Sequence, residues 1–538
     1  MFFIFISFNN KRIKIVWLIY TFILLGLSVR LYFLQVYPAS YVLNNYTNKQ
    51  SEVVSDVVFN VYDDNLKDLC DYTKKYVVVV DKKPFSLNNY EDTLKSLIAF
   101  NYIMKNGVDD FSFTDIINSS GKTYYDVSKE TYDKVKKLIN LKGVYAYERK
   151  EIDKKYAWNN GVMFQNMINL NDYSSKSLQQ DIYNYLKDNE NNYKDFYIDS
   201  DARYIETSEI VPSFNKNIQL TINDDLEQEV KEVLDKEEYK DYENIGIMIM
   251  ESDTGKIKAM VQKDESMANI NLGIEGVGYE PGSIFKAITL ASALEEGQIT
   301  MNSELFCNGR ICKSGSHGKL STEKAFFVSC NDIYAQIGNN VSYDKLIDYS
   351  SKCGLFDKVL NMQGETSGNK PKKEDGMNNI SIGQCITVSP IQMLGAINTL
   401  VNNGTYVKPY IVDKVLDSNN NSIKEYSTEK INVFSKTTSM QVKEAMKGTI
   451  LYGTGKKAYV DNVLLGGKTG SATSGNGKCT HCWFAGYYKL NDKVYTMIVC
   501  VPNINNSLNE NVGGGGIAAP IFGDIIKAQI NKLLISNV

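Results

Sequence analysis

Histidine, proline and tryptophan are scarce in this sequence, with two, nine and three of them among 538 residues. Because only His317 and His481 are available, a Ser-His-Asp hydrolase would have little from which to build its base. The nine cysteines are odd in number and scattered, which excludes a dense disulfide framework and leaves one bridge, Cys307 to Cys312, allowed by spacing. The net charge of −4 gives no excess of basic residues of the kind that binds nucleic acid, so we expect no nucleic-acid partner.

One long apolar run is present, near the N-terminus. Basic residues at 11, 12 and 14 precede an uncharged stretch over 15–29, followed by Arg30 and four more apolar residues. A span of about 20 residues crosses a hydrocarbon core if Arg30 reaches the outer interface. We therefore predict a short cytoplasmic segment (1–14), a transmembrane anchor (15–36) and an extracytoplasmic remainder, which makes a single-pass protein of the cell membrane. A cleaved signal peptide is the competing interpretation.

The remainder divides into two predicted regions. Residues 37–215 are rich in Tyr, Asn, Lys and Asp, and short apolar runs such as 76–80 favour an α+β spacer or docking domain without a catalytic signature. Residues 216–538 form the second region, in which the apolar runs 245–250 and 256–261 flank Asp253-Thr254-Gly255. That pattern is typical of a β-hairpin, so we expect this domain to contain antiparallel sheet.

A buried helix is predicted over 283–294, directly after Pro281-Gly282. Nearly every face of it is apolar, yet it contains Lys286, one turn after Ser283. A buried ammonium is costly unless it is paired or loses its proton. A desolvated lysine beside a serine hydroxyl is typical of a general base next to a nucleophile, although Ser-x-x-Lys alone also fits a lysine that reaches solvent.

Two later motifs complete a site for acyl transfer. In the first, Ser329-Cys330-Asn331, we expect Ser329 to move a proton to the leaving nitrogen and Asn331 to bind Lys286 and the substrate amide. In the second, Lys468-Thr469-Gly470-Ser471, the Lys468 ammonium and Thr469 hydroxyl suit a substrate carboxylate, and Gly470 allows a close backbone approach. The backbone N–H groups of Ser283 and Ser471 could form an oxyanion hole.

The ordered set Ser-x-x-Lys, Ser-x-Asn and Lys-Thr-Gly resembles the transpeptidase domain of the class B, monofunctional penicillin-binding proteins. The similarity extends to Tyr279-Glu280-Pro281-Gly282, to Ser381-Ile382-Gly383-Gln384 and to the segment 481–487. It implies an α+β, serine β-lactamase-like fold, an antiparallel sheet with helices on both faces, in which Ser283 begins a central helix and Lys468 lies on an edge strand.

The same resemblance implies D,D-transpeptidation. Ser283 would be acylated by a D-Ala-D-Ala stem peptide of peptidoglycan and would pass the acyl group to an amine, and β-lactams would acylate the same serine. It also suggests a polytopic glycan polymerase as partner, and the chemistry needs no cofactor. The alternatives are a D,D-carboxypeptidase or serine β-lactamase that uses the same site, or a non-catalytic β-lactam-binding scaffold.

A structural zinc site is a separate hypothesis. Cys479, His481 and Cys482 have the residue types and C-x-x-C spacing of zinc ligands, close to the Lys-Thr-Gly motif. Ordinary packing or a local disulfide explains them equally well, because adjacent side chains point to opposite faces of a strand. We interpret Cys330 as a small buried side chain and His317 as a loop residue.

Overall fold

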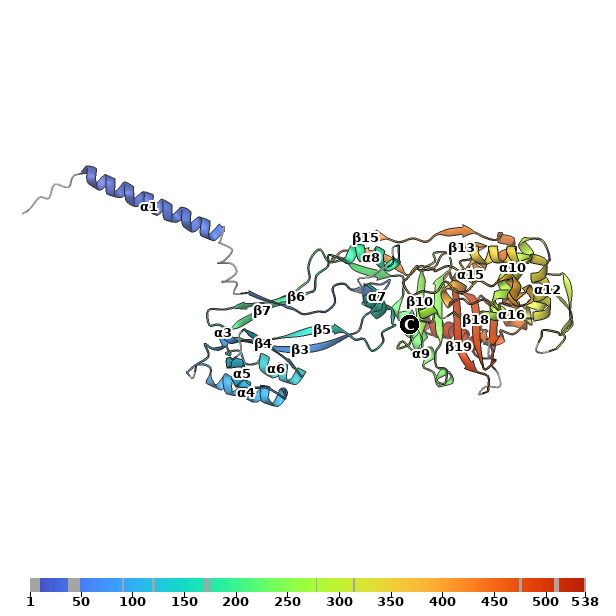
Figure 1. Cartoon of the computed structure of the whole chain (residues 1–538), viewed down its shortest axis with the longest axis horizontal. Coiled ribbons are helices and arrows are strands. Elements are labelled where there is room, and N and C mark those ends of the chain that lie inside the picture. The colour runs from blue at the N-terminus through green and yellow to red at the C-terminus, as the bar shows by residue number, and fades with distance from the viewer. Residues whose placement is uncertain are drawn as a thin grey trace, which may run out of the picture. The chain divides into compact units, whose positions relative to one another are not determined.

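The computed structural model describes residues 10–36, 49–89, 91–118, 121–168, 174, 176–276, 278–312, 315–473, 477–507 and 512–536 (Figure 1). The predicted cytoplasmic residues 1–9 and the start of the predicted spacer, 37–48, lie outside this description. The chain forms two compact units that interleave along the sequence. Unit 1 comprises Met1–Asp56, Lys74–Lys150 and Asn192–Ile210, and unit 2 comprises Val57–Thr73, Glu151–Asn191 and Val211–Val538.

Helix α1 (Asn10–Val36) covers the predicted anchor. Its section Lys14–Tyr32 has 19 residues with a mean hydropathy of 1.9, carries charges only at Lys14 and Arg30, and buries none of its surface within the structure. At 1.5 Å per residue this section is about 28 Å long, close to the thickness of a hydrocarbon core. The helix is therefore long and apolar enough to cross a membrane once.

The valine run of unit 1 forms a strand that is buried on both faces. It belongs to β3 (Tyr72–Asp81), which lies between β4 (Lys122–Val127) and β5 (Val144–Ile152). Side chains alternate along a strand, so Val78 and Val80 pack against helices α4 (Leu94–Gly107) and α6 (Lys129–Lys136), while Val77 and Val79 pack against Tyr145, Tyr147 and Phe196. A second sheet has the order β1-β6-β7, formed by Lys49–Val53, Tyr193–Ile198 and Tyr204–Ile210.

Unit 2 is organised around a five-stranded antiparallel sheet of order β10-β9-β19-β18-β17. The strands are β9 (Gly246–Glu251), β10 (Ile257–Gln262), β17 (Leu465–Thr473), β18 (Cys479–Leu490) and β19 (Lys493–Asn505). The predicted hairpin is confirmed as β9 and β10, and β17 lies at the sheet edge as the resemblance implies.

Helices cover both faces of this sheet, as predicted. Helices α9 (Asp224–Leu234) and α17 (Ala518–Ser536) pack with Ile247, Ile249 and Val499 on one face. On the other face Met248 and Ile498 pack in one core with α10 (Lys286–Glu295), α15 (Pro390–Val401) and α16 (Lys436–Tyr452). Every side chain of α10 from Lys286 to Ala293 is buried, so the predicted central helix is confirmed.

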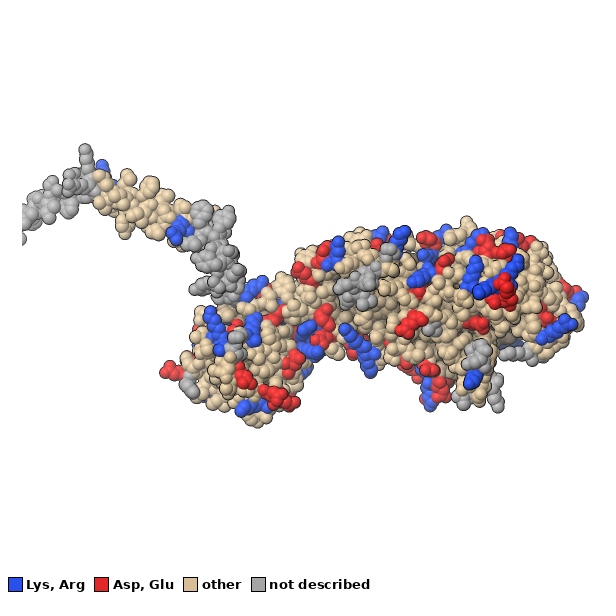
Figure 2. Space-filling model, viewed as in Figure 1, with Lys and Arg blue, Asp and Glu red and all other residues tan. Residues whose placement is uncertain are grey.

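Charged side chains of both signs are interspersed on the face of the molecule shown in Figure 2. This distribution agrees with the small net charge of −4.

Candidate active site

The turn that carries Ser283 is held close to strand β17. Ser283 lies in a 3₁₀ turn, Gly282–Phe285, that continues into α10. Gly282 has φ of 54°, and a Cβ atom there would lie 2.8 Å from the carbonyl oxygen of Ser471. A Cβ on Gly470 would lie 2.6 Å from the carbonyl oxygen of Pro281. Glycine at both positions therefore allows the serine turn and the Lys-Thr-Gly strand to touch through their backbones.

Lys286 is fully buried and reaches the Ser-x-Asn motif. Its Nζ donates to the carbonyl oxygen of Ser329 at 2.6 Å, to Oδ1 of Asn331 at 2.7 Å and to the Ser329 hydroxyl at 3.2 Å. Burial lowers the pKa of Lys286 to about 7. A lysine in this state can accept a proton near neutral pH.

Ser329 lies in the turn between α11 (Thr322–Phe327) and α12 (Asn331–Val341), with φ of 56°. A non-glycine residue at this φ is strained, and such strain is concentrated at functional sites. The carbonyl oxygen and the hydroxyl of Ser329 both accept from Nζ of Lys286. Asn331 donates through Nδ2 to the carbonyl oxygen of Ile311 at 3.2 Å.

Lys468 reaches the same hydroxyl from strand β17. Its Nζ donates to Oγ of Ser329 at 2.8 Å and to the carbonyl oxygen of Thr469 at 3.0 Å. Burial and the nearby charge of Lys286 both lower the pKa of Lys468. Two lysines from different elements thus converge on one serine hydroxyl, an arrangement that can move a proton between them.

The remaining predicted binding residues continue along β17. The hydroxyls of Thr469 and Thr454 lie 2.6 Å apart, and Ser471 Oγ accepts from the backbone N–H of Gly514 at 2.9 Å. The structure therefore brings all three sequence motifs into one site. The assignment of the backbone N–H groups of Ser283 and Ser471 to an oxyanion hole stays a prediction.

Four residues that the sequence analysis did not combine form a cluster beside this site: Cys307, Cys312, His317 and Cys330. Cys312 Sγ lies 3.7 Å from Sγ of Cys307 and 3.6 Å from Sγ of Cys330, and Cys307 Sγ lies 3.5 Å from Nδ1 of His317. The suggested Cys307–Cys312 bridge is wrong, because both cysteines are free thiols. Cys330 is buried in the hydrophobic core as predicted, and its Sγ lies beside that of Cys312.

The spacing Cys307-x₄-Cys312-x₄-His317 is the signal that could have revealed this cluster. These residues lie on and around a hairpin of β11 (Glu304–Cys307) and β12 (Gly318–Ser321). The fourth member, Cys330, is in the Ser-x-Asn motif, so only the fold unites it with the hairpin.

The predicted set Cys479, His481 and Cys482 does not form such a cluster among the described residues. All three lie on β18, where neighbouring side chains alternate between the two faces of the sheet. Cys482 is buried in the core that contains α17, whereas His481 packs against Tyr279 with ring centroids 4.9 Å apart. The backbone N–H of Asn503 donates to Nδ1 of His481 at 3.2 Å.

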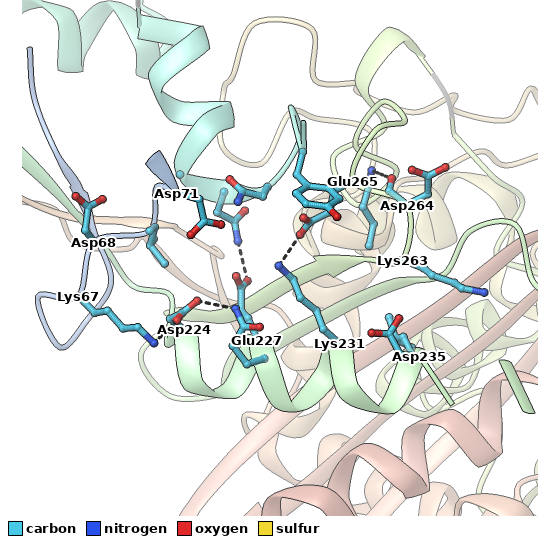
Figure 3. Close-up of a pocket in the computed structure, with 18 residues that line it drawn as sticks. Lys67, Asp68, Asp71, Asp224, Glu227, Lys231, Asp235, Lys263, Asp264 and Glu265 are labelled. Atoms are coloured by element: carbon cyan, nitrogen blue, oxygen red, sulfur yellow. Dashed lines mark hydrogen bonds and ion pairs between the residues drawn. The ribbon is translucent and has the colours of Figure 1, made fainter. Parts of the chain in front are cut away.

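A cavity of ≈ 590 Å³ lies elsewhere in unit 2 and contains none of the three motifs (Figure 3). Its lining includes Glu227, which accepts from Nδ2 of Asn160 at 2.7 Å and from the backbone N–H of Met260 at 2.8 Å. Burial raises the pKa of Glu227 to about 8. In Figure 3 Lys231 points to Glu265, with which it forms an ion pair of 2.7 Å.

Comparison with known proteins agrees with this geometry. Residues 245–527 match the family model for the penicillin binding protein transpeptidase domain. This match covers more than half of the chain, so the protein belongs to the penicillin-binding protein transpeptidase family, the class that its fold and three motifs define.

Among individual relatives, Stage V sporulation protein D of Bacillus subtilis is 30% identical over 356 residues, which are 60% of this chain and 54% of that protein. Penicillin-binding protein PbpB of Mycolicibacterium smegmatis is 25% identical over 351 residues, 57% of this chain and 53% of that protein. The chain thus spans about half the length of these relatives. They confirm the predicted resemblance to the class B proteins.

A crystal structure of a peptidoglycan synthetase from Bifidobacterium adolescentis superposes with a TM-score of 0.62 at 17% identity, over 90% of this chain and 97% of that one. Penicillin binding protein 3 from Mycobacterium tuberculosis, in complex with aztreonam, superposes with a TM-score of 0.59 at 16% identity, over 90% and 98% of the two chains. At such identities the likeness bears on the fold alone, and it confirms the predicted fold class.

Proposed function

We propose that the protein is a peptidoglycan D,D-transpeptidase that works through an acyl-enzyme on Ser283. The observation that carries this proposal is the convergence of Lys286 and Lys468 on the hydroxyl of Ser329, beside the turn of Ser283. Family membership supports the reaction class, and a crystallised relative in complex with aztreonam supports a β-lactam-accessible site in this family.

In the acylation step, Lys286 accepts the proton of Ser283 as its Oγ attacks the carbonyl carbon of the penultimate D-Ala. The C–N bond to the terminal D-Ala breaks as Ser329 delivers a proton to the leaving nitrogen. Lys286 returns the proton it took from Ser283 to the oxygen of Ser329, which lies 3.2 Å away, so that both groups are restored. Lys468 and Thr469 hold the substrate carboxylate, which a cationic and a hydroxyl donor suit. An amine of a second stem peptide then attacks the ester, takes the acyl group and restores the Ser283 hydroxyl.

The test is intact mass spectrometry of the full chain, solubilised in detergent and incubated with a penicillin, beside Ser283→Ala. A stable mass increase of one drug molecule that the variant lacks is expected. Rapid return to the free mass with hydrolysed drug would favour the β-lactamase alternative, and hydrolysis of D-Ala-D-Ala peptide without amine transfer would favour the carboxypeptidase. A chain that neither forms an adduct nor turns over substrate would be a scaffold, and the enzymatic proposal would be wrong.

We further propose that α1 anchors the protein in the cell membrane, with the N-terminus in the cytoplasm and the site outside. The basic residues at 11, 12 and 14 before the apolar section support this orientation through the positive-inside rule. Cysteine labelling at positions introduced on each side of α1 tests it, because only the external position should react in intact cells. A polytopic glycan polymerase as partner stays a prediction from the family.

We also propose that Zn²⁺ binds at Cys307, Cys312, His317 and Cys330. Bond lengths of about 2.3 Å to sulfur and 2.0 Å to nitrogen in a tetrahedron place two sulfurs about 3.8 Å apart, and a sulfur and a nitrogen about 3.5 Å apart. The distances of 3.5–3.7 Å in the cluster support this geometry. The backbone N–H of Asp332 also donates to Cys312 Sγ at 3.5 Å, an outer contact that suits a thiolate ligand.

Zinc in this place would be structural. It would fix the β11–β12 hairpin to the turn that carries Ser329 and would take no part in acyl transfer. Metal analysis of the purified chain should find one zinc, and His317→Ala should lose it together with part of the thermal stability. Cys479→Ser is the matched control and should retain the metal. If the wild-type chain contains no metal and chelators leave its melting temperature unchanged, the zinc proposal is wrong. That result would not affect the proposed serine mechanism.

A further inference from the structure

The two lysines of the site are buried without an acidic side chain, among those that the structure describes, to balance their charge. Lys286 and Lys468 are both fully buried, and within the described residues neither ammonium forms an ion pair with a carboxylate. Their hydrogen-bond partners are neutral oxygens, and the two lysines share the hydroxyl of Ser329 as an acceptor. The charge of Lys286 also lowers the pKa of Lys468. A buried cation without a carboxylate partner is unfavourable, and burial accordingly lowers the pKa of both lysines. A group that stabilises positive charge here would therefore favour the ammonium that forms on Lys286 during the reaction.

Each ammonium lies against one aromatic ring. Nζ of Lys286 is 5.6 Å from the ring centroid of Tyr334, and Nζ of Lys468 is 5.5 Å from that of Phe326. Both distances are within the range of a cation–π interaction, which is strongest where water is excluded. The two rings are fully buried and contact each other, with centroids 5.9 Å apart at an interplanar angle of 55°.

We propose that Phe326 and Tyr334 are positioning residues of the acyl-transfer reaction. They form an aromatic platform that holds the amino groups of Lys286 and Lys468 at the hydroxyl of Ser329 and stabilises the positive charge that Lys286 gains when it accepts the proton of Ser283. Phe326 precedes Ser329 by three residues on α11, and Tyr334 follows it by five on α12, so the platform is built around the Ser-x-Asn turn. The inference rests on the proposed function, because it concerns the same site.

The surroundings of the Tyr334 hydroxyl show whether the site uses the ring or the hydroxyl of this residue. This oxygen is buried and has no hydrogen-bond partner among the described residues. A tyrosine retained for its hydroxyl would be hydrogen-bonded, since an unsatisfied buried hydroxyl costs free energy. The ring face toward Lys286 is therefore the part of Tyr334 that serves the site.

The experiment measures acylation of the full-length protein in detergent by a fluorescent penicillin, and resolves the binding constant from the rate constant of the covalent step. Tyr334→Phe keeps the ring and should acylate like the wild type. Tyr334→Leu should slow the covalent step about tenfold, because Lys286 is the base. Phe326→Leu should mainly weaken binding by a similar factor, because Lys468 holds the carboxylate.

Phe522→Leu is the packing control. Phe522 is fully buried in the other core of unit 2, so its replacement should lower the melting temperature without slowing acylation. If the leucine variants fail to fold, pentafluorophenylalanine at position 334 preserves the shape of the ring and reverses its quadrupole, and should also slow acylation.

Two results would overturn the platform. One is a folded Tyr334→Leu protein, or the fluorinated protein, that acylates at the wild-type rate. The other is a Tyr334→Phe protein that is as slow as Tyr334→Leu, which would assign the effect to the hydroxyl. A wild-type chain that is not acylated at all would instead refute the proposed function, so the two failures are distinguishable.

Discussion

The ammonium of Lys468 lies 2.8 Å from the hydroxyl of Ser329, although 139 positions separate the two residues in the sequence. Lys286 approaches the same hydroxyl at 3.2 Å from a third element. The three motifs therefore meet at the hydroxyl oxygen of Ser329. This oxygen links Lys286, which is suited to act as the base, to Lys468, which is suited to bind an anion.

Loss of the Ser329 hydroxyl should slow acylation at Ser283 without unfolding the protein. We expect Ser329→Ala and Ser329→Gly both to lower the acylation rate about a hundredfold, the usual contribution of a proton-transfer group. Their stabilities should differ, because φ of 56° strains alanine and not glycine. Stopped-flow acylation and thermal melts check both effects, and equal melting temperatures would contradict the strain.

The acylation rate should rise as the pH increases through about 7. Burial lowers the pKa of Lys286 to about 7, and only the unprotonated amine can accept the proton of Ser283. Below this pKa the base is blocked, and well above it the rate should level off. Acylation measured between about pH 5 and 9 tests the sign, and a rate that falls or stays constant on passing pH 7 would exclude Lys286 as the base.

Gly282→Ala should damage the site more than a surface substitution would. The new Cβ would lie 2.8 Å from the Ser471 carbonyl oxygen, and φ of 54° is unfavourable for alanine. We expect a loss of about 1–3 kcal/mol in unfolding free energy together with slower acylation. Gly276→Ala is a matched control, since it also has positive φ, of 78°, but no atom within 4 Å of the new Cβ. Equal acylation rates in the two variants would contradict the close approach of the turn to β17.

Glu227 should make stability fall as the pH rises from about 4.5 to 8. Burial raises the pKa of Glu227 to about 8 from 4.5, so the folded protein retains a proton that the unfolded chain has lost. The stabilising contribution is present below the unfolded pKa and is lost as the pH passes through the folded one. The effect is on the order of 5 kcal/mol.

Glu227→Gln should remove most of this pH dependence in thermal melts, because the amide does not titrate. Asp71→Asn is the control, since Asp71 lines the same cavity but is exposed. If the wild type and Glu227→Gln lose stability in parallel between these pH values, the carboxyl is ionised in the folded state.

Much of the site was predictable because its information is local. Ser283 and Lys286 share a helical face by their spacing, and the apolar residues around them indicate burial of the lysine. The valine run 76–80 indicates a strand, and the uncharged stretch 15–29 indicates an apolar helix. In each case the residues that carry the signal are neighbours in the chain, so periodicity and composition suffice.

The hypothesis of a metal site at residues 479–482 was wrong because a strand does not direct these side chains to one point. Cys479, His481 and Cys482 are close in sequence, but strand β18 turns the adjacent side chains of His481 and Cys482 to opposite faces of the sheet, so the three do not converge. Cys307, Cys312, His317 and Cys330 span 24 residues, yet a hairpin and a helix start bring their ligand atoms within 4.8 Å of one another.

The sequence alone determined the three motifs, their order and the apolar helix, because these depend on local pattern and on residue type. The fold class followed from the family resemblance that the motifs carry. Only the tertiary structure decided that both lysines meet at Ser329, that Phe326 and Tyr334 lie against them, and that Cys330 joins the hairpin. These contacts join segments distant along the chain, and their distances follow from the packing of helices on the sheet, which no spacing in the sequence encodes.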